Sequence, residues 1–426
     1  MKAVLLAAGE GVRLLPITAT RPKHLIKVAG KPILQYCLEA VKNAGIDEAV
    51  IVIHYMGEAI RQYFGDGEKI GLHLSYVEQK AVLGTGNATS VAEPFVDDDF
   101  VLVYGDLLFG REAIKKVVKL YKAGKSAAVM AAVPVDEPEN YGIIELEDDK
   151  TVKRIVEKPA VGKAPSSLAN AGIYAFSKDV FSRLKATKAS VRGESELTDA
   201  VTLLAKEGKA VLAAEVSKDD WFDVGRPWDL LEANNWALKR MDHQALGTLE
   251  QDAHLIGPVS VAESARIRSG AYIQGPSFID EECDIGPNCH IRPGATLGKR
   301  VRVGNACEVK NSIIMDGTHV GHLSYVGDSI FGENCNLGAG TMTANLRLDK
   351  GQIKMMVKGQ LINTERRKLG AVFGDNVSTG IKSLFMPGVK IGVNCWVGPN
   401  VMVERDLPDN SIALLKQNCE IQQKKS

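Results

Sequence analysis

The sequence predicts an α/β protein in two parts, in which a largely parallel sheet covered by helices is followed by a parallel β-helix. Two patterns support this prediction. Apolar runs alternate with helical patterns up to about residue 236, and from residue 252 an apolar residue recurs at every sixth position. With 426 residues, of which 45% are hydrophobic, the chain can bury more than one core.

The first part contains three apolar runs that are typical of buried strands, at 3–7, 49–53 and 100–104. Helical patterns near 32–44 and 111–123 separate them. Strands that alternate with helices form a parallel sheet with both faces covered, and ligands bind at the carboxyl ends of such strands.

The second part is a hexapeptide repeat. Ten consecutive apolar positions lie six residues apart, from Leu255 to Val309, and Gly follows many of the repeat positions. The register shifts to Ile314 and again to Phe331, and the repeat resumes at Phe373 after an interruption. Three hexapeptides per turn form a prism whose apolar residues stack inward.

The seven cysteines show no C-x-x-C pair, which argues against a zinc site or a disulfide framework. Five of them lie four residues after an apolar repeat position, where a small residue is needed. We therefore expect these five to fill the core of the β-helix: Cys283, Cys289, Cys307, Cys335 and Cys395.

The predicted boundaries are a first domain at 1–240, a linker at 241–251, the β-helix at 252–410 and a tail at 411–426. A helical pattern at 228–240 leads into the linker. Within the β-helix, the segment Leu346–Leu369 breaks the repeat and carries seven cations against two acids, which is typical of a solvated loop or of a binding face.

The overall charge excludes some partner classes. Lys plus Arg and Asp plus Glu both number 52, so nothing global favours nucleic acid or an anionic membrane. The short apolar run at the N-terminus is too short for a signal peptide, and no apolar stretch could span a bilayer, so we expect a cytoplasmic protein.

A glycine-rich turn, L-A-A-G-E-G-V-R, follows the first predicted strand. Leu14 replaces the third glycine of a dinucleotide-binding turn, and no Gly-Lys-Ser/Thr follows as in a P-loop. The first 31 residues hold a single acid, Glu10, against a set of cations suited to a polyanion such as a triphosphate: Lys2, Arg13, Arg21, Lys23, Lys27 and Lys31.

That turn, with R-P-K-H-L-I-K-V-A-G-K-P at 21–32, resembles the signature of the sugar-1-phosphate nucleotidylyltransferases. Further matching motifs occur in order across the first domain: G-T-G-N-A at 84–88, Y-G-D at 104–106, Y-G-I at 141–143, E-K-P at 157–159, N-A-G-I-Y at 170–174 and W-F-D-V-G at 221–225. The resemblance implies a Rossmann-like nucleotidyltransferase domain.

The resemblance also implies residue roles. Arg13 would face the leaving pyrophosphate and Lys23 would bridge the reacting phosphates. Ala8, Gly9, Gln79, Gly84 and Thr85 would contact the nucleoside of UTP or dTTP, and Gly142, Glu157 and Asn170 would hold the sugar. Because a sugar 1-phosphate is already an anionic nucleophile, its attack on the α-phosphate needs charge neutralisation and alignment rather than a protein base.

Two aspartates of the matched motifs are candidate ligands for Mg²⁺. Asp106 follows an apolar strand, and Asp223 lies in a similar context. Carboxylate oxygens shared with phosphate oxygens are the donors that this hard cation prefers.

The segment 317–345 resembles the acetyltransferase half of bifunctional enzymes that acetylate glucosamine 1-phosphate and uridylylate the product. The resemblance implies a left-handed β-helix, a homotrimer or a multiple of three, acetyl-CoA as co-substrate, and His322 as the general base. It also implies acceptor or pantetheine contacts by these residues: Arg292, Lys310, Tyr325, Asn336, Ala339, Asn345 and Lys354.

The sequence departs from the bacterial bifunctional enzymes in two ways. Asp223 stands where those enzymes carry Asn, and Leu346 replaces an aromatic residue. Two other functions therefore stay open: a glucose-1-phosphate thymidylyltransferase or uridylyltransferase with a non-catalytic β-helix, and a non-catalytic assembly subunit.

Overall fold

The computed structural model describes residues 1–124, 126–148, 150–187 and 193–423. The α/β unit comprises Met1–Gly11, Arg21–Ile26 and Lys31–Val224, and the β-helix unit comprises Val12–Thr20, Lys27–Gly30 and Gly225–Ser426. Of the expected tail, residues 424–426 lie outside the described residues. None of the described helices combines the length and apolarity needed to cross a bilayer.

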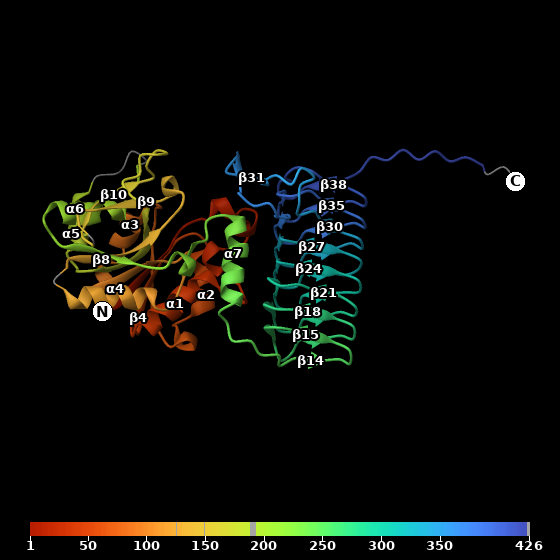
Figure 1. Cartoon of the computed structure of the whole chain (residues 1–426), viewed down its shortest axis with the longest axis horizontal. Helices are drawn as coiled ribbons and strands as arrows, with labels where there is room; N and C mark the ends of the chain where they lie inside the picture. The colour runs from red at the N-terminus through yellow and green to blue at the C-terminus, as the bar shows by residue number, and fades with distance from the viewer. Residues whose placement is uncertain (125, 149, 188–192, 424–426) are drawn as a thin grey trace. The chain divides into compact units, whose positions relative to one another are not determined.

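The α/β unit is built on one nine-stranded sheet (Figure 1). The strand order is β10-β9-β11-β6-β1-β4-β5, and β8 pairs with both β11 and β12. The strands are β1 (Lys2–Ala7), β4 (Glu48–Ile53), β5 (His73–Glu78), β6 (Phe100–Tyr104), β8 (Ala128–Pro134), β9 (Gly142–Leu146), β10 (Val152–Glu157), β11 (Leu168–Phe176) and β12 (Val211–Glu215).

Helices cover both faces of this sheet, as predicted. They are α1 (Ile33–Asn43), α2 (Gly57–Phe64), α3 (Thr85–Ser90), α4 (Ala113–Ala123), α5 (Val180–Ala186) and α6 (Leu197–Lys206). Residues of β1 alternate between two apolar cores: Leu5 packs with α1, α2 and α4, whereas Val4 packs with α3, α5 and α6. This alternation is the two-residue period of a strand that is buried on both sides.

The predicted strands at 3–7, 49–53 and 100–104 are confirmed as β1, β4 and β6, which run parallel. The sheet as a whole is mixed, because β11 runs antiparallel to β6, β8 and β9. Two short strands, β7 (Leu107–Phe109) and β13 (Trp221–Asp223), form a separate antiparallel ladder.

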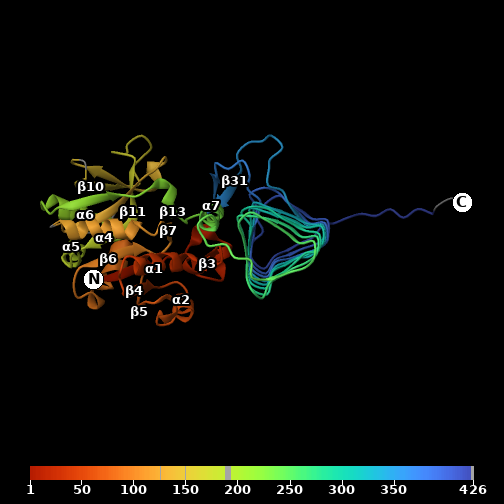
Figure 2. The ribbon, with the colours of Figure 1, turned by 60° about the horizontal axis from the view of Figure 1, so that its bottom comes forward.

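The β-helix unit contains a left-handed parallel β-helix of triangular cross-section (Figure 2). Its three sheets hold 9, 8 and 7 strands. The first contains β14 (Thr248–Leu249), β17 (Arg266–Ile267), β20 (Asp284–Ile285), β23 (Arg302–Val303), β26 (His319–Val320), β29 (Asn336–Leu337), β34 (Ser378–Thr379), β37 (Trp396–Val397) and β39 (Ile412–Ala413). The second contains β15 (His254–Ile256), β18 (Tyr272–Gln274), β21 (His290–Ile291), β24 (Glu308–Lys310), β27 (Tyr325–Gly327), β30 (Met342–Thr343), β35 (Leu384–Phe385) and β38 (Met402–Val403). The third contains β16 (Val259–Val261), β19 (Ser277–Ile279), β22 (Thr296–Leu297), β25 (Ile313–Ile314), β28 (Ile330–Phe331), β33 (Val372–Phe373) and β36 (Lys390–Ile391).

The pairing register confirms three hexapeptides per turn. Ile267 pairs with Ile285, and Ile285 pairs with Val303, so each residue lies beside its equivalent in the next coil. The five expected cysteines are all buried, and all seven cysteines are free thiols. Burial raises the pKa of the thiols of Cys283 and Cys289 to about 12, which keeps them protonated and unreactive.

Two further parts belong to the β-helix unit. The predicted connecting helix is α7 (Pro227–Leu238). The interruption of the repeat forms a hairpin of β31 (Lys354–Val357) and β32 (Gln360–Asn363). The short strand β2 (Lys27–Val28) also lies in this unit, and β3 (Lys31–Pro32) lies in the α/β unit.

Candidate functional site

The carboxyl ends of β1 and β6 bring together Gly9, Lys23 and Asp106. The two strands are parallel neighbours, and the amide of Gly105 donates to the carbonyl of Leu6 at 2.9 Å. The Lys23 side chain lies over Gly9, since a Cβ at that glycine would be 3.3 Å from Nζ. Lys23 forms an ion pair with Asp106. The missing side chain of Gly9 thus leaves room for the lysine beside the turn.

The electrostatics of this cluster keep its carboxylate ionised. Burial opposes the charge on Asp106, but the Lys23 ammonium outweighs it and holds the pKa of that carboxyl below its ordinary value. Burial, followed by the charge of Lys23, lowers the pKa of His24 to about 3, so this imidazole is neutral. Asp106 is therefore ionised in this cluster, whereas His24 is neutral.

Asp223 lies beside Asp106. It ends β13, where it pairs with Leu107, and the amide of Val224 donates to the carbonyl of Asp106 at 3.3 Å. Two carboxylates on adjacent backbone segments offer the oxygen donors that Mg²⁺ prefers, with further positions left for phosphate oxygens and water. Among the residues that the structure describes, no group of three or more His, Cys, Asp and Glu side chains could hold a metal. Asp106 and Asp223 are thus two carboxylates of the type that could share an ion with substrate oxygens.

Arg13 is placed differently from Lys23. It belongs to the β-helix unit, where its guanidinium lies against Gly225, at 2.9 Å from the position a Cβ would take. Gly225 is the last residue of the W-F-D-V-G motif that contains Asp223. The sequence predicted a phosphate role for Arg13, and that role stays a prediction.

Three of the five predicted nucleoside contacts, Gln79, Gly84 and Thr85, gather at the start of α3. Gln79 is buried, and its Nε2 donates to Asn87 Oδ1 at 2.8 Å and to the Gly84 carbonyl at 3.3 Å. Gly84 has a φ of +96°, and a Cβ there would lie 2.5 Å from the carbonyl of Ser195. Only glycine fits this turn. Thr85 Oγ1 accepts from the amide of Leu197 at 3.1 Å, and Ala8 is buried just after β1.

The predicted sugar contacts also come together. Gly142 pairs directly with Glu157 across β9 and β10, and Glu157 Oε1 accepts from the Thr198 hydroxyl at 2.9 Å. Asn170 lies on β11 and accepts from the amide of Gly172. A Cβ at Gly142 would lie 2.8 Å from the Glu157 carboxylate, so the glycine leaves that carboxylate uncovered on one side.

Tyr104 links the nucleoside and sugar groups and was missed by the sequence reasoning. Burial raises the pKa of Tyr104 to about 12, and the side chains of Thr85 and Asn170 lie near enough to its hydroxyl to lower that pKa in part. The phenol is therefore a neutral hydrogen-bonding group. The available signal was its place at the head of the Y-G-D motif, directly at the end of β6.

In the β-helix unit, Lys310, Tyr325 and Asn345 form one hydrogen-bonded group around Asp328. The Lys310 ammonium is 2.8 Å from Asp328 Oδ2, and Asn345 Nδ2 donates to that oxygen at 2.5 Å and to the Tyr325 hydroxyl at 3.0 Å. Asp328 is buried, and its other oxygen accepts from Asn311. Asp328 thus binds Lys310 and Asn345 directly, and Asn345 connects it to Tyr325.

Arg292 extends this group along the same sheet. Its guanidinium pairs with Glu308 at 2.8 Å, and Glu308 lies beside Tyr325 in the strand register. The hydrogen bond to Glu308 raises the pKa of Arg292 above its ordinary value.

His322 lies at the other end of this face. It is exposed in the turn before β27, whereas Asp328 lies just after β27. The His322 carbonyl accepts from Ser324 Oγ at 2.8 Å and from the amide of Gly340 at 3.0 Å, which places Ala339 at the equivalent turn of the next coil. Asn336 is exposed on β29 beside His319, on a different sheet. Within one chain, then, His322 and the Asp328 group lie at opposite ends of β27.

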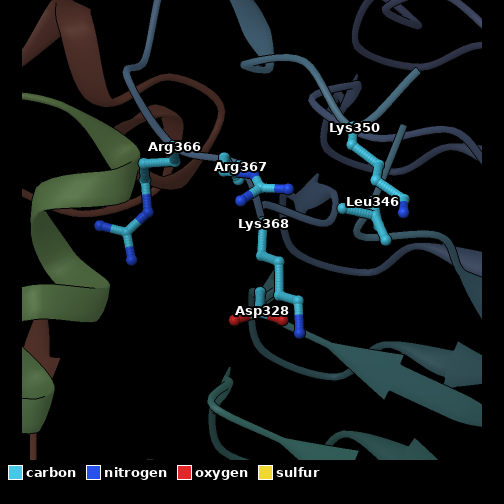
Figure 3. Close-up of a pocket in the computed structure, with 6 residues that line it drawn as sticks. All are labelled: Asp328, Leu346, Lys350, Arg366, Arg367 and Lys368. Atoms are coloured by element: carbon cyan, nitrogen blue, oxygen red, sulfur yellow. The ribbon is translucent and has the colours of Figure 1, made fainter. Parts of the chain in front are cut away.

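A basic pocket of about 540 Å³ opens beside Asp328 (Figure 3). Its lining contains one acid and four cations: Asp328, Leu346, Lys350, Arg366, Arg367 and Lys368. In Figure 3 the Lys368 side chain extends toward Asp328, while Arg366 turns toward α7, where it pairs with Glu232 at 2.5 Å. Lys354, predicted from this loop, lies on β31 and is exposed. Lys354 does not line the pocket, whereas Arg366, Arg367 and Lys368 do. This run of three cations was the feature of the sequence that could have indicated the pocket.

Comparison with known proteins identifies the family. The family model described as nucleotidyl transferase matches residues 2–240, and the model of the GMPPB C-terminal domain matches residues 273–382. The chain is 43% identical to the bifunctional protein GlmU of Methanocaldococcus jannaschii, over 96% of this chain and 97% of that one. The chain belongs to the GlmU family.

Further relatives agree with this assignment. The bifunctional sugar-1-phosphate nucleotidylyltransferase/acetyltransferase of Sulfurisphaera tokodaii is 40% identical over 96% of this chain and 98% of that one. A crystal structure of UDP-glucose pyrophosphorylase with UDP-glucose matches 56% of this chain and 99% of its own, at 30% identity and a TM-score of 0.52. As a member of the GlmU family, the chain is a nucleotidyltransferase and an acetyltransferase.

Proposed function

We propose that the chain makes UDP-N-acetylglucosamine in two steps, one in each unit. The β-helix unit would acetylate glucosamine 1-phosphate, and the α/β unit would join the product to UMP from UTP. The observation that supports this proposal is that each unit of a GlmU-family chain holds its own polar cluster, around Asp106 in one and around Asp328 in the other.

In the acetyl-transfer step, the 2-amino group of the sugar attacks the thioester carbonyl of acetyl-CoA. The C–N bond forms, the C–S bond breaks, and the thiolate of CoA leaves. His322 takes the proton that the amine loses and passes it on to the thiolate. Arg292, Lys310 and Lys368 would bind the phosphate, and Asn345 and Tyr325 would orient the amino sugar.

Because His322 and the Asp328 group lie at opposite ends of one face, we propose that the acetyl-transfer site is completed by a neighbouring copy in a homotrimer. Asn336, beside His319 on β29, and Ala339, at the turn equivalent to that of His322, would then contact the amino sugar and the pantetheine arm.

In the nucleotidyl-transfer step, a phosphate oxygen of the sugar 1-phosphate attacks the α-phosphorus of UTP. The new P–O bond forms as the bond to the β-phosphate oxygen breaks, and pyrophosphate leaves. Lys23 stabilises the charge on the reacting phosphates, and Arg13 stabilises the leaving group. Asp106 and Asp223 would hold Mg²⁺, which supplies further positive charge to the phosphates when bound.

The test is mass spectrometry of the products formed from glucosamine 1-phosphate, acetyl-CoA, UTP and Mg²⁺. We expect UDP-N-acetylglucosamine and pyrophosphate. A nucleotide sugar without the acetyl group would contradict the acetyl-transfer step and would leave the β-helix as a non-catalytic part.

A pair of variants sharpens this test. His322→Ala should lower acetyl transfer by about 10²- to 10⁴-fold and leave nucleotidyl transfer unchanged, because general-base catalysis contributes on that order. His319→Ala is the matched control, since His319 lies three residues earlier on β26. Equal losses in the two variants would contradict the role of His322.

A further inference from the structure

Lys27, which lies within the motif at 21–32, forms an ion pair with Asp316 of the β-helix. Its ammonium is 2.8 Å from Asp316 Oδ2, with side-chain exposures of 26% and 18%. Asp316 is itself held in place, because its Oδ1 accepts from the amide of Lys299 at 3.0 Å. The charge of Lys27 also acts on a second carboxylate, Asp280. Burial raises the pKa of Asp280, and the charge of Lys27 lowers it in part. A cation that the sequence grouped with phosphate-binding residues therefore serves a contact within the β-helix unit.

The segment before Lys23 is fixed in the same unit. Thr20 Oγ1 donates to Asp375 Oδ2 at 2.7 Å, and Asp375 Oδ1 accepts from the amide of Glu333 at 2.8 Å. Asp375 belongs to the coil that follows the inserted hairpin. The hydroxyl of Thr20 thus donates to a carboxylate that a backbone amide of the β-helix holds in place.

The residues after Lys27 are held by α7 and by the stacked coils. The amide of Ala29 donates to Asn234 Oδ1 at 2.8 Å. Asn234 is fully buried, and it also bonds the Thr296 hydroxyl at 2.7 Å and the Gly294 carbonyl at 3.1 Å. Gly30, with a φ of +81°, packs so closely on the Phe278 ring that a Cβ would lie 2.5 Å from it.

These contacts fix both flanks of Arg21–Ile26, the six-residue segment that carries Lys23. The chain enters this segment from Thr20 and leaves it into Lys27, so the backbone freedom of Lys23 is limited from both sides by covalent continuity. Charge stabilisation of a phosphoryl transfer is sensitive to placement on the scale of 1 Å.

We propose that Asp316, Asn234 and the Thr20–Asp375 hydrogen bond position Arg21–Ile26, and with it Lys23, for nucleotidyl transfer. In this arrangement the β-helix serves the chemistry of the other unit in addition to its own. The inference rests on the proposed nucleotidyl transfer, and it predicts that substitutions on the β-helix, far from Lys23 in sequence, lower the turnover of that reaction.

The test uses the full chain with the double substitution Asp316→Asn and Thr20→Val. Asparagine keeps an acceptor for the Lys299 amide but loses the charge that holds Lys27, and valine keeps the shape of threonine without its hydroxyl. We expect kcat for pyrophosphate release from MgUTP and N-acetylglucosamine 1-phosphate to fall about tenfold. KM for the sugar phosphate and the rate of acetyl transfer should stay within twofold of wild type.

Two control variants complete the experiment. Asp284→Asn removes a different ion pair of the β-helix, with Arg268, and should change neither activity. Asp316→Glu in the Thr20→Val background keeps the charge and should recover most of the lost turnover.

Three outcomes would count against a proposal. Wild-type kcat in the double variant, or equal losses of both activities, would overturn the positioning role, since the second result indicates a general loss of folding. Absence of pyrophosphate release by the wild-type chain would instead refute the proposed nucleotidyl transfer itself.

Discussion

The two units differ in how sequence distance relates to distance in space. In the β-helix, each buried residue contacts its equivalent one coil earlier and one coil later, as Ile285 does with Ile267 and Val303. In the α/β unit, the charged cluster unites Gly9, Lys23 and Asp106 because β1 lies beside β6 in the sheet. The β-helix is built from local, repeated contacts, whereas the charged cluster of the α/β unit depends on the order of the strands in the sheet.

Because of this difference, substitutions in the two units should change different properties of the protein. The β-helix distributes its stability over a column of similar residues, and its polar group lies next to the place where the repeat is interrupted. The α/β unit places a few charged side chains at strand ends, where they add little to the core. We therefore expect charge removal in the α/β unit to affect catalysis, and core truncation in the β-helix to affect stability.

The largest expected effect is that of Lys23→Met. Methionine keeps most of the side-chain volume but removes the ammonium beside Asp106, so kcat for nucleotidyl transfer should fall about 10³-fold, as for other lost transition-state charges. Acetyl transfer should be unchanged. Lys31→Met is the matched control, because Lys31 pairs with Glu39 instead, and it should keep wild-type turnover within about threefold. An equal loss in both variants would show that the charge at Lys23 has no special role.

The next effect concerns the β-helix core. Phe373 stacks on Phe331 with ring centroids 4.0 Å apart and meets Phe385 edge-on at 4.8 Å. Phe373→Ala should destabilise the β-helix unit by about 3 to 4 kcal/mol through lost burial and a cavity. Denaturant unfolding followed by acetyl-transfer activity measures this loss.

Trp396→Ala is the control for that measurement. Trp396 is on a neighbouring sheet and is 60% exposed, so its truncation should cost well under about 1 kcal/mol. If nucleotidyl transfer in Phe373→Ala were lost at a lower denaturant concentration than acetyl transfer, the assignment of stability to the β-helix core would be wrong.

The repeat made much of the β-helix predictable. A six-residue period determines which residues point inward and which coils they meet, and it also explains the buried cysteines. The position of the interruption was predicted, but its structure was not, because no sequence period indicates the β31–β32 hairpin or the Arg366–Glu232 pair. The sequence of a basic segment does not show which of its cations form ion pairs.

The same reason explains the N-terminal cations. The sequence grouped Lys2, Lys23, Lys27 and Lys31 as one set, but the structure pairs them with different acids. Lys2 lies near Asp97 and Glu48, Lys31 binds Glu39, and Lys27 binds Asp316, which is 289 positions away in the chain. Counting charges locally cannot detect such distant partners. The matched motif contains Lys23, Lys27 and Lys31 alike, and only the role implied by the family resemblance distinguished Lys23.

The smallest expected effect is a pH dependence of stability in the α/β unit. His24 is buried beside Lys23, its Nδ1 has no hydrogen-bond partner among the described residues, and its pKa is lowered from 6.5 to about 3. Between these values the unfolded chain binds a proton that the folded unit excludes, so stability is lost as pH falls from 6.5 toward 3. The contribution of this one group is about 1.4 kcal/mol per pH unit. His24→Leu should flatten the acid side of the stability curve by that amount. Urea unfolding at pH 7, 6 and 5 measures the difference, and parallel curves for the variant and the wild type would show that this histidine is protonated as readily in the folded unit as in the unfolded chain.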